Sequence, residues 1–469
     1  MTLSLTHSST QGGSSVGTRN FLNVMSLGRL CNNQEVEVMM MMRMQRGIAG
    51  YASRSTTDSF LPSSQTSKKG NSRLCVSVRD YYCYMLQTRP GIFNPILCGA
   101  RLLQQWGVDM YIKIESCRLK WYRKNQTKIC ADLYKGVVDA ITSGETRASA
   151  VGVRIVLPGT YPGGDRDMKW RHMDAMAIVH TYGKPDIFLT MTCNPNWEEI
   201  TNELFPGQTA QDRPDLVARV FHGKLEAMKE MLFKKNILGV VANVYVVEFQ
   251  KRGLPHAHFL LIMDFAYKLV VLEQYDRLIS AELPDKQKYP ELHALVVKHM
   301  MHGPCGALNP KNVCMQQNEC KCRYPRPFNE NTAQGKNSYP VYRRRDNGRQ
   351  AKVRGKMLDN RWVVPYNPYL LRMFNCHINV EVCSSIKAVK YLYKYIYKGH
   401  DRASFSIDQP DADGNIDEIK RYVDARWVTP PKAMWRIFGF PLCANDPPAY
   451  SCLFISQICT GWHSMSKLT

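Results

Sequence analysis

The sequence predicts an α+β protein with a pair of antiparallel strands set among helical segments. Two β-rich runs, Val240–Phe249 and His256–Met263, are separated by a short stretch that contains Gly253 and Pro255. Glycine and proline at such a position favour a loop between antiparallel strands. A third strand-like run, Ile187–Thr192, precedes them, and the apolar periodicity of Leu216–Lys234 indicates a helix between the strands.

The N-terminal half divides into three parts. Residues 1–72 are rich in Ser, Thr, Gly and Met without steady periodicity, which is typical of a disordered leader or of a doubtful gene-model start. Residues 73–150 form a helical N-terminal part, since Val76–Tyr134 has a helical pattern. Residues 151–264 hold the three predicted strands.

Three further parts follow. Residues 265–345 form an insertion rich in Cys and His, and a basic stretch runs from Arg343 to Lys356. Residues 346–442 contain a strong predicted helix, Ser384–Gly399, with a Ser start and a Gly stop. Residues 443–469 are interpreted as a divergent tail.

The charge of the chain favours a polyanionic partner. Lys and Arg number 62 against 40 Asp and Glu, which gives a formal net charge of +22, and the sequence pI is about 9.4. Contacts to nucleic-acid phosphates release condensed counterions, so a surplus of this size suits nucleic acid. A merely basic soluble protein is the alternative interpretation.

Other composition features limit the function classes. We find no apolar run long enough to predict a membrane span and no signal-peptide pattern. Sixteen cysteines without a secretion signal indicate a reducing compartment, with thiols free or bound to metal. The chain has no G-x-x-x-x-G-K-[ST] loop, so no ATPase or helicase activity is predicted.

A His-x-His pair opens the second β-rich run. Side chains alternate along a strand, so His256 and His258 share a face, and Glu248 and Gln250 share a face of the preceding run. If the two runs pair, one of these two residues can add an oxygen ligand, and the site would hold a divalent ion. A chance His pair in a strand is the alternative.

The predicted helix Ser384–Gly399 is rich in tyrosine and lysine. On a helical wheel, Tyr391 and Tyr395 fall on the side opposite the apolar stripe, and Lys387, Lys394 and Lys398 share that side. Tyr393 falls on the core side and Tyr397 at the flank. Phenols among ammonium groups suit attack on a phosphodiester. The alternative is a basic aromatic helix that only stacks on bases or packs on a neighbour.

The insertion contains a cluster of potential zinc ligands. The cluster consists of His299, His302, Cys305, Cys314, Cys320 and Cys322. The spacing lacks a clean pair of C-x-x-C knuckles, so a set of reduced cysteines in a loop stays open beside a structural zinc site. Our preferred ligands are His302, Cys305, Cys314 and Cys320.

Three blocks in order resemble the Helitron helicase-like domain, the N-terminal region of Helitron transposases, and plant members in particular. Phe188–Trp197 resembles the first replication-initiator motif of this family, Glu248–His258 its metal-binding motif, and Lys390–Gly399 its tyrosine motif. The similarity covers roughly residues 76 to 440. It extends through Pro162–Gly164, Asp174–Met176, His302–Gly306 and Trp362–Pro368.

The resemblance implies an HUH-endonuclease core, an antiparallel sheet flanked by helices. It implies nicking and transfer of single-stranded DNA at transposon ends, through a 5′-phosphotyrosine link, in rolling-circle transposition in the nucleus. By motif match, the nucleophiles would be Tyr391 and Tyr395, and His256 and His258 would hold Mg²⁺ or Mn²⁺. Candidate DNA contacts are the three lysines of the tyrosine helix together with Arg252, Asn194 and Trp197.

The sequence also departs from the family pattern. Family members continue into an ATP-driven helicase, which this sequence lacks, so a helicase would be needed in trans. Residues 443–469 do not follow the pattern and are interpreted as a frameshift or misjoined exon, and Cys320–Cys322 replaces the more usual Cys-Ser-Lys. Two alternatives therefore stay open: a relic that binds single-stranded nucleic acid without cutting it, and a zinc-dependent interaction module.

Overall fold

The computed structural model describes residues 76–129, 154–249, 253–335, 340–383, 416–424 and 426–448. The residues from Val76 onward belong to one compact unit. The predicted leader, the predicted tyrosine helix Ser384–Gly399, and the loop residues Gln250 and Arg252 lie outside the described residues. Within the ranges given above, every helix is too short or too polar to cross a membrane.

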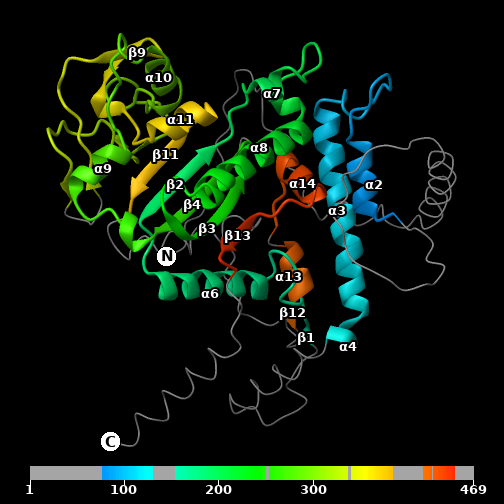
Figure 1. Cartoon of the computed structure of the whole chain (residues 1–469). Coiled ribbons are helices and arrows are strands. Elements are labelled where there is room, and N and C mark those ends of the chain that lie inside the picture. The colour runs from blue at the N-terminus through cyan, green and yellow to red at the C-terminus, as the bar shows by residue number, and fades with distance from the viewer. Residues whose placement is uncertain are drawn as a thin grey trace, which may run out of the picture. The chain divides into compact units, whose positions relative to one another are not determined.

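A five-stranded antiparallel sheet forms the centre of the fold (Figure 1). The strand order is β11–β2–β4–β3–β13, so β4 lies in the middle. The predicted strands are confirmed almost to the residue. The three predicted strands are β2 Ile187–Thr192, β3 Val240–Phe249 and β4 Pro255–Met263. The sheet also contains β11 Ile378–Val382 and β13 Cys443–Asp446, which the sequence did not predict.

Strand β13 corrects the prediction that residues 443–469 are a divergent tail. Cys443 lies opposite Val246 of β3, and Asp446 lies opposite Asn243. The edge of β3 that faces away from β4 is therefore hydrogen-bonded to residues of the predicted tail. The structural unit includes residues up to at least Asp446.

Helices cover both faces of the sheet. On one face, Leu189, Phe259 and Leu261 pack in a core with α8 (Pro214–Lys229), α3 (Arg101–Lys124) and α14 (Pro430–Ile437). On the other face, Leu260 and Ile262 pack with α6 (Asp165–Tyr182). The two sets alternate along β4 because successive side chains of a strand point to opposite faces. The mixed helix and antiparallel-sheet class is thus confirmed.

The first two of the three N-terminal helices contribute to the main core. Their bounds are α2 Val78–Met85, α3 Arg101–Lys124 and α4 Gln126–Ile129. Gly107 of α3 faces Met434 of α14, and a Cβ at Gly107 would lie 2.5 Å from the Met434 Cε. Glycine therefore allows the close approach of these two helices, which are far apart in the sequence.

The Cys- and His-rich segment forms a module of short helices and hairpins beside β11 (Figure 1). Its core joins Val296 and Met300 to Val363 and Tyr366. The predicted boundary between residues 345 and 346 cuts through this core and is corrected. The elements are α9 Leu272–Leu278, α10 Pro290–Leu295, α11 Pro368–Phe374, β5 Met315–Gln316, β6 Glu319–Cys320, β7 Ala333–Gln334, β8 Pro340–Val341, β9 Gln350–Val353 and β10 Lys356–Asp359.

Four smaller elements complete the α6 side and the end of β2. Strand β1 (Arg154–Ile155) pairs in parallel with β12 (Ile416–Asp417), which leads into α13 (Glu418–Asp424). Helix α7 (Glu198–Thr201) follows β2. An ion pair between Arg166 and Glu418, 2.8 Å apart, links α6 to α13.

Candidate functional site

His256 and His258 lie on one face of the central strand β4, as the sequence predicts. Strand β3 pairs with β4 so that Glu248 lies directly opposite His256. The Glu248 carboxylate reaches the neighbouring imidazole, with 3.3 Å between its Oε2 and the Nε2 of His258. The predicted hairpin thus places two imidazoles and one carboxylate on the same face.

Two threonines on the other neighbouring strand hold the imidazoles in place. Strand β2 sets Thr190 opposite His258 and Thr192 opposite His256. Each hydroxyl is hydrogen-bonded to an Nδ1, at 2.9 Å for Thr190 and 3.0 Å for Thr192. The Nε2 atoms are therefore the ring nitrogens turned away from these hydroxyls, and the Nε2 of His258 faces the Glu248 carboxylate. Second-shell bonds of this kind orient the histidines that bind metals.

We call His256, His258, Glu248, Thr190 and Thr192 the histidine face. Burial, with an added effect of the neighbouring His258 and an opposing effect of Glu248, lowers the pKa of His256 to about 4. A neutral imidazole is the form that binds a metal ion. The imidazole of His256 is therefore a competent ligand at neutral pH without first losing a proton.

The ligand atoms of the histidine face are of the types that bind a divalent ion, but they are not gathered around one point. Two imidazole nitrogens and a carboxylate oxygen suit Mn²⁺ and, with added water, Mg²⁺. The ring centroids of His256 and His258 are 5.8 Å apart. Among the described residues, only the cysteine module gathers three or more His, Cys, Asp or Glu ligand atoms within 4.8 Å of one another.

The Cys- and His-rich module brings together His302, Cys305, Cys314 and Cys320, which we call the cysteine cluster. These are the four preferred ligands predicted from the sequence, and they could hold a metal such as zinc. The Cys320 Sγ lies 3.4 Å from the Nε2 of His302. The exposed Cys322 is not part of the group.

A tight hairpin brings the cysteines together. Strands β5 and β6 are joined by Gln317 and Asn318, both with positive φ, so Met315 pairs with Cys320. The backbone N–H of Lys321 donates to the Cys314 carbonyl at 2.9 Å. Two cysteines that are six positions apart are thereby folded to the same end of the hairpin.

Aromatic rings support the cluster from one side. The ring of His302 stacks on Tyr324, with centroids 4.3 Å apart, and lies parallel to Trp362 at 6.4 Å. Burial, together with the adjacent Cys320 and Cys314, raises the pKa of Cys305 to about 12. The Cys305 thiol therefore stays protonated by itself, and a bound cation would stabilise its thiolate form.

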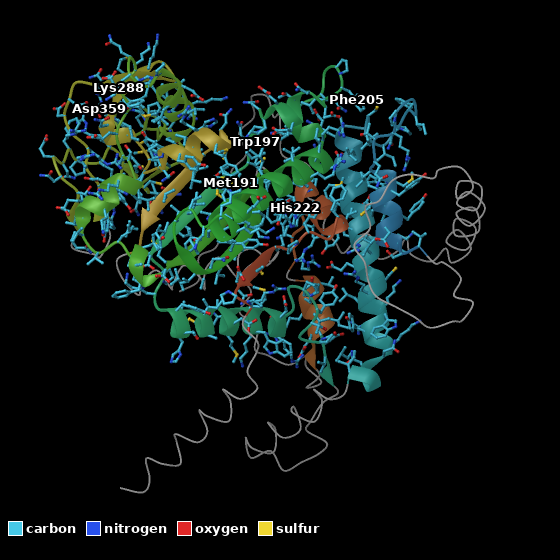
Figure 2. All side chains as sticks on the ribbon, in the orientation of Figure 1. Met191, Trp197, Phe205, His222, Lys288 and Asp359 are labelled. Carbon is cyan, nitrogen blue, oxygen red and sulfur yellow. The ribbon has the colours of Figure 1, made fainter. Side chains whose placement is uncertain are left out.

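Two residues predicted to contact DNA are placed inside the protein. Asn194 is 5% exposed and Trp197 is 3% exposed. The Asn194 Nδ2 donates to the Asn375 carbonyl at 2.7 Å, and the Trp197 Nε1 donates to the Phe374 carbonyl at 2.7 Å. Figure 2 shows Trp197 beyond the end of β2. These hydrogen bonds fasten the loop after β2 to the end of α11, and a role of the two residues in DNA binding stays a prediction.

The other predicted site residues lie outside the described residues. These are Tyr391, Tyr395, Lys387, Lys394, Lys398, Gln250 and Arg252. Their roles stay predictions.

Sequence reasoning missed three residues near the histidines. Thr190 and Thr192 alternate within a run that was recognised as a strand, and this alternation was the available signal. His377 immediately precedes β11, and its backbone carbonyl accepts from the Thr192 N–H at 3.0 Å. Its position depends on the pairing of β11 with β2, which no local pattern indicates.

Comparison with known proteins identifies the region that contains this site. Residues 81–261 match the family described as the Helitron helicase-like domain at the N-terminus. The match includes β2, β3 and most of β4, and therefore the whole histidine face. No curated protein matches the chain.

Proposed function

We propose that this chain, whose residues 81–261 match the Helitron helicase-like domain, is a Helitron-related transposon protein that nicks single-stranded DNA and transfers the cut strand. The observation that carries the proposal is the histidine face. Two imidazoles oriented by threonine hydroxyls lie beside a carboxylate on the central strand of an antiparallel sheet. We further propose that the sheet is of the HUH-endonuclease type.

In this proposal, the histidine face binds Mg²⁺ or Mn²⁺ through His256, His258 and Glu248. The bound ion would polarise the scissile phosphate and offset its developing charge. A hydroxyl of Tyr391 or Tyr395 attacks the phosphorus, a 5′-phosphotyrosine link forms, and the bond to the 3′ oxygen breaks. The proton of the phenol leaves to solvent, and the freed 3′-hydroxyl remains on the other DNA fragment. Transfer reverses this step on a second strand.

Three wider parts of the proposal rest on the family relationship. The DNA substrate would be a transposon end, the unwinding activity would come from a helicase in trans, and the site of action would be the nucleus. For the cysteine cluster, we propose Zn²⁺ as the ion, because three thiols and one imidazole are a common tetrahedral zinc set.

The decisive experiment is to trap the covalent adduct. The chain is incubated with a labelled single-stranded oligonucleotide and Mg²⁺ or Mn²⁺ and analysed on a denaturing gel. We expect the parent chain to carry label at the size of protein plus DNA. The double variant Tyr391→Phe/Tyr395→Phe should lose the adduct and keep DNA binding, because its lysines remain. His256→Asn with His258→Asn should also lose the adduct.

Two controls make the result specific. Tyr393→Phe should keep the adduct, because Tyr393 falls on the core side of the predicted helix. His222→Asn should also keep it, because His222 stacks on Phe440 and is not part of the histidine face. An adduct that survives in the double tyrosine variant would place the nucleophile elsewhere. A parent chain that binds DNA but forms no adduct would favour a relic that binds single-stranded nucleic acid without cutting it.

A further inference from the structure

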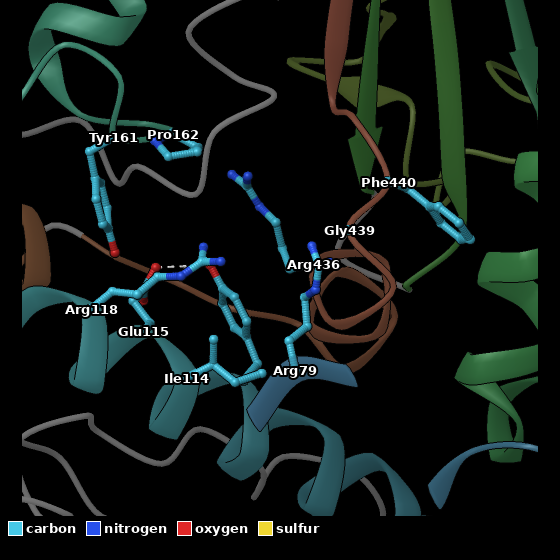
Figure 3. Close-up of a pocket in the computed structure, with 10 residues that line it drawn as sticks. Arg79, Ile114, Glu115, Arg118, Tyr161, Pro162, Arg436, Gly439 and Phe440 are labelled. Atoms are coloured by element: carbon cyan, nitrogen blue, oxygen red, sulfur yellow. Dashed lines mark hydrogen bonds between the residues drawn. The ribbon is translucent and has the colours of Figure 1, made fainter. Parts of the chain in front are cut away.

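A pocket lined by arginines lies apart from both the histidine face and the cysteine cluster (Figure 3). Its cavity volume is about 170 Å³. Arg79 comes from α2, Arg118 from α3 and Arg436 from α14, and the loop before α6 adds Tyr161. Four segments that are distant in the sequence thus place three guanidinium groups around one hollow. None of the lining residues belongs to the two candidate metal sites.

One acidic side chain lines the pocket, and its charge is already compensated. Glu115 accepts hydrogen bonds from the hydroxyls of Tyr111 at 2.9 Å and Tyr422 at 3.1 Å. It also forms an ion pair with Arg426, whose side chain is 5% exposed. The carboxylate is therefore occupied by groups beside the pocket. The Arg79 guanidinium also contacts the exposed Asp80 carboxylate at 3.5 Å, and three guanidinium groups in all line the hollow.

Two further lining residues are Tyr161, whose hydroxyl is a neutral hydrogen-bond donor, and Gly439, which has no side chain. Burial raises the pKa of Tyr161, and the nearby Glu115 raises it further, so its hydroxyl keeps its proton at neutral pH. Gly439 has φ +76°, and a Cβ there would lie 2.7 Å from the Nη1 of Arg79. Glycine suits the positive φ of this turn and leaves room for the Arg79 guanidinium beside it.

We propose that this pocket binds a phosphate group. Guanidinium forks match the tetrahedral oxygens of phosphate and form charge-assisted hydrogen bonds with them. Two sources share this chemistry, the backbone of a nucleic acid and a free phosphate or mononucleotide. The inference does not depend on cleavage, since a chain that only binds single-stranded DNA would use the pocket in the same way.

The test compares Arg118→Gln with a matched control on the same helix, Lys120→Gln. Both side chains are exposed, and both changes remove one positive charge, but Lys120 does not line the pocket. Binding of the full chain to a single-stranded oligonucleotide is measured over a range of salt concentrations without added Mg²⁺ or Mn²⁺. Arg118→Gln should weaken binding roughly three- to tenfold. It should also reduce the slope of log affinity against log salt by about 0.7, the value for one lost single-strand phosphate contact.

A second arm distinguishes the two sources. Inorganic phosphate is titrated calorimetrically into the parent chain and both variants. Loss of oligonucleotide affinity in Arg118→Gln alone supports the nucleic-acid backbone as the source. If Arg118→Gln loses phosphate binding but keeps its oligonucleotide affinity, the ligand of the pocket is a free phosphate. Equal effects in the two variants, or none in Arg118→Gln, would overturn the proposal. Because no cleavage is measured, this result is independent of the adduct experiment.

Discussion

At the scale of single residues, the candidate nuclease site depends on two hydroxyl groups. Thr190 and Thr192 each bond the Nδ1 of the histidine on the neighbouring strand. The hydrogen bond at one ring nitrogen decides which nitrogen of the imidazole faces a ligand. A strand residue with no direct contact to an ion can therefore control how well the histidines bind one.

We expect Thr190→Val to weaken Mn²⁺ binding about 10- to 100-fold, the usual effect of losing an outer-shell partner. Valine keeps the shape of threonine but cannot bond the His258 Nδ1. The measurement is calorimetric titration of Mn²⁺ into the parent chain and the variant. Thr332→Val is the control, because the buried Thr332 hydroxyl donates to Asp276 within the Cys- and His-rich module. An equal loss of affinity in the control would refute the positioning role.

At the scale of elements, the β5–β6 hairpin and its flanking segments build the cysteine cluster. Cys305 and Cys320 are buried in a small core with Leu358 and Trp362. Small cores bury little apolar surface, so a bound metal can supply much of their stability. A metal bound by the cluster would therefore help this module of short strands and helices to hold one conformation.

Purified chain should contain about one zinc ion per molecule, and Cys305→Ser should reduce the zinc content to near zero. The same variant should lower the free energy of unfolding of the module, because loss of a structural metal is among the largest effects of single substitutions. Metal content is measured by elemental analysis and stability by denaturant titration. Cys322→Ser is the matched control, because this exposed thiol lies outside the cluster. Absence of zinc from the parent chain would remove the proposal.

At the scale of the whole molecule, the sheet is completed by the most C-terminal segment that the structure describes. Strand β13 pairs with the outer edge of β3, and the Arg171 guanidinium of α6 donates to the Cys443 Sγ at 2.9 Å. This strand therefore ties the sheet to a helix on its α6 face. The fold is not divided after Leu442, the position where the predicted tail begins.

Truncation after Leu442 should lower the free energy of unfolding by a few kcal/mol, since each lost backbone hydrogen bond contributes about 1 kcal/mol. It also exposes the edge of β3, which favours aggregation. Truncation after Pro448 keeps β13 and should leave stability close to that of the full chain. Thermal unfolding of the three proteins gives the comparison. Equal melting temperatures for both truncated proteins would show that β13 is dispensable.

The sequence alone determined the features that depend on local periodicity. Strands β2, β3 and β4, the shared face of His256 and His258, and the approach of Glu248 all follow from side-chain alternation and one short loop. The four cysteine-cluster residues lie close enough in the chain for their spacing to suggest them. The match at residues 81–261 agrees with the motifs recognised there.

Only the tertiary structure decided the features that depend on which distant segments meet. The threonine contacts require β2 beside β4, the burial of Trp197 requires the end of α11, and β13 requires the free edge of β3. The arginine pocket needs four separate segments. Local pattern fixes the faces of each element, whereas strand order and helix packing follow from burial of the whole apolar surface, which no single segment encodes.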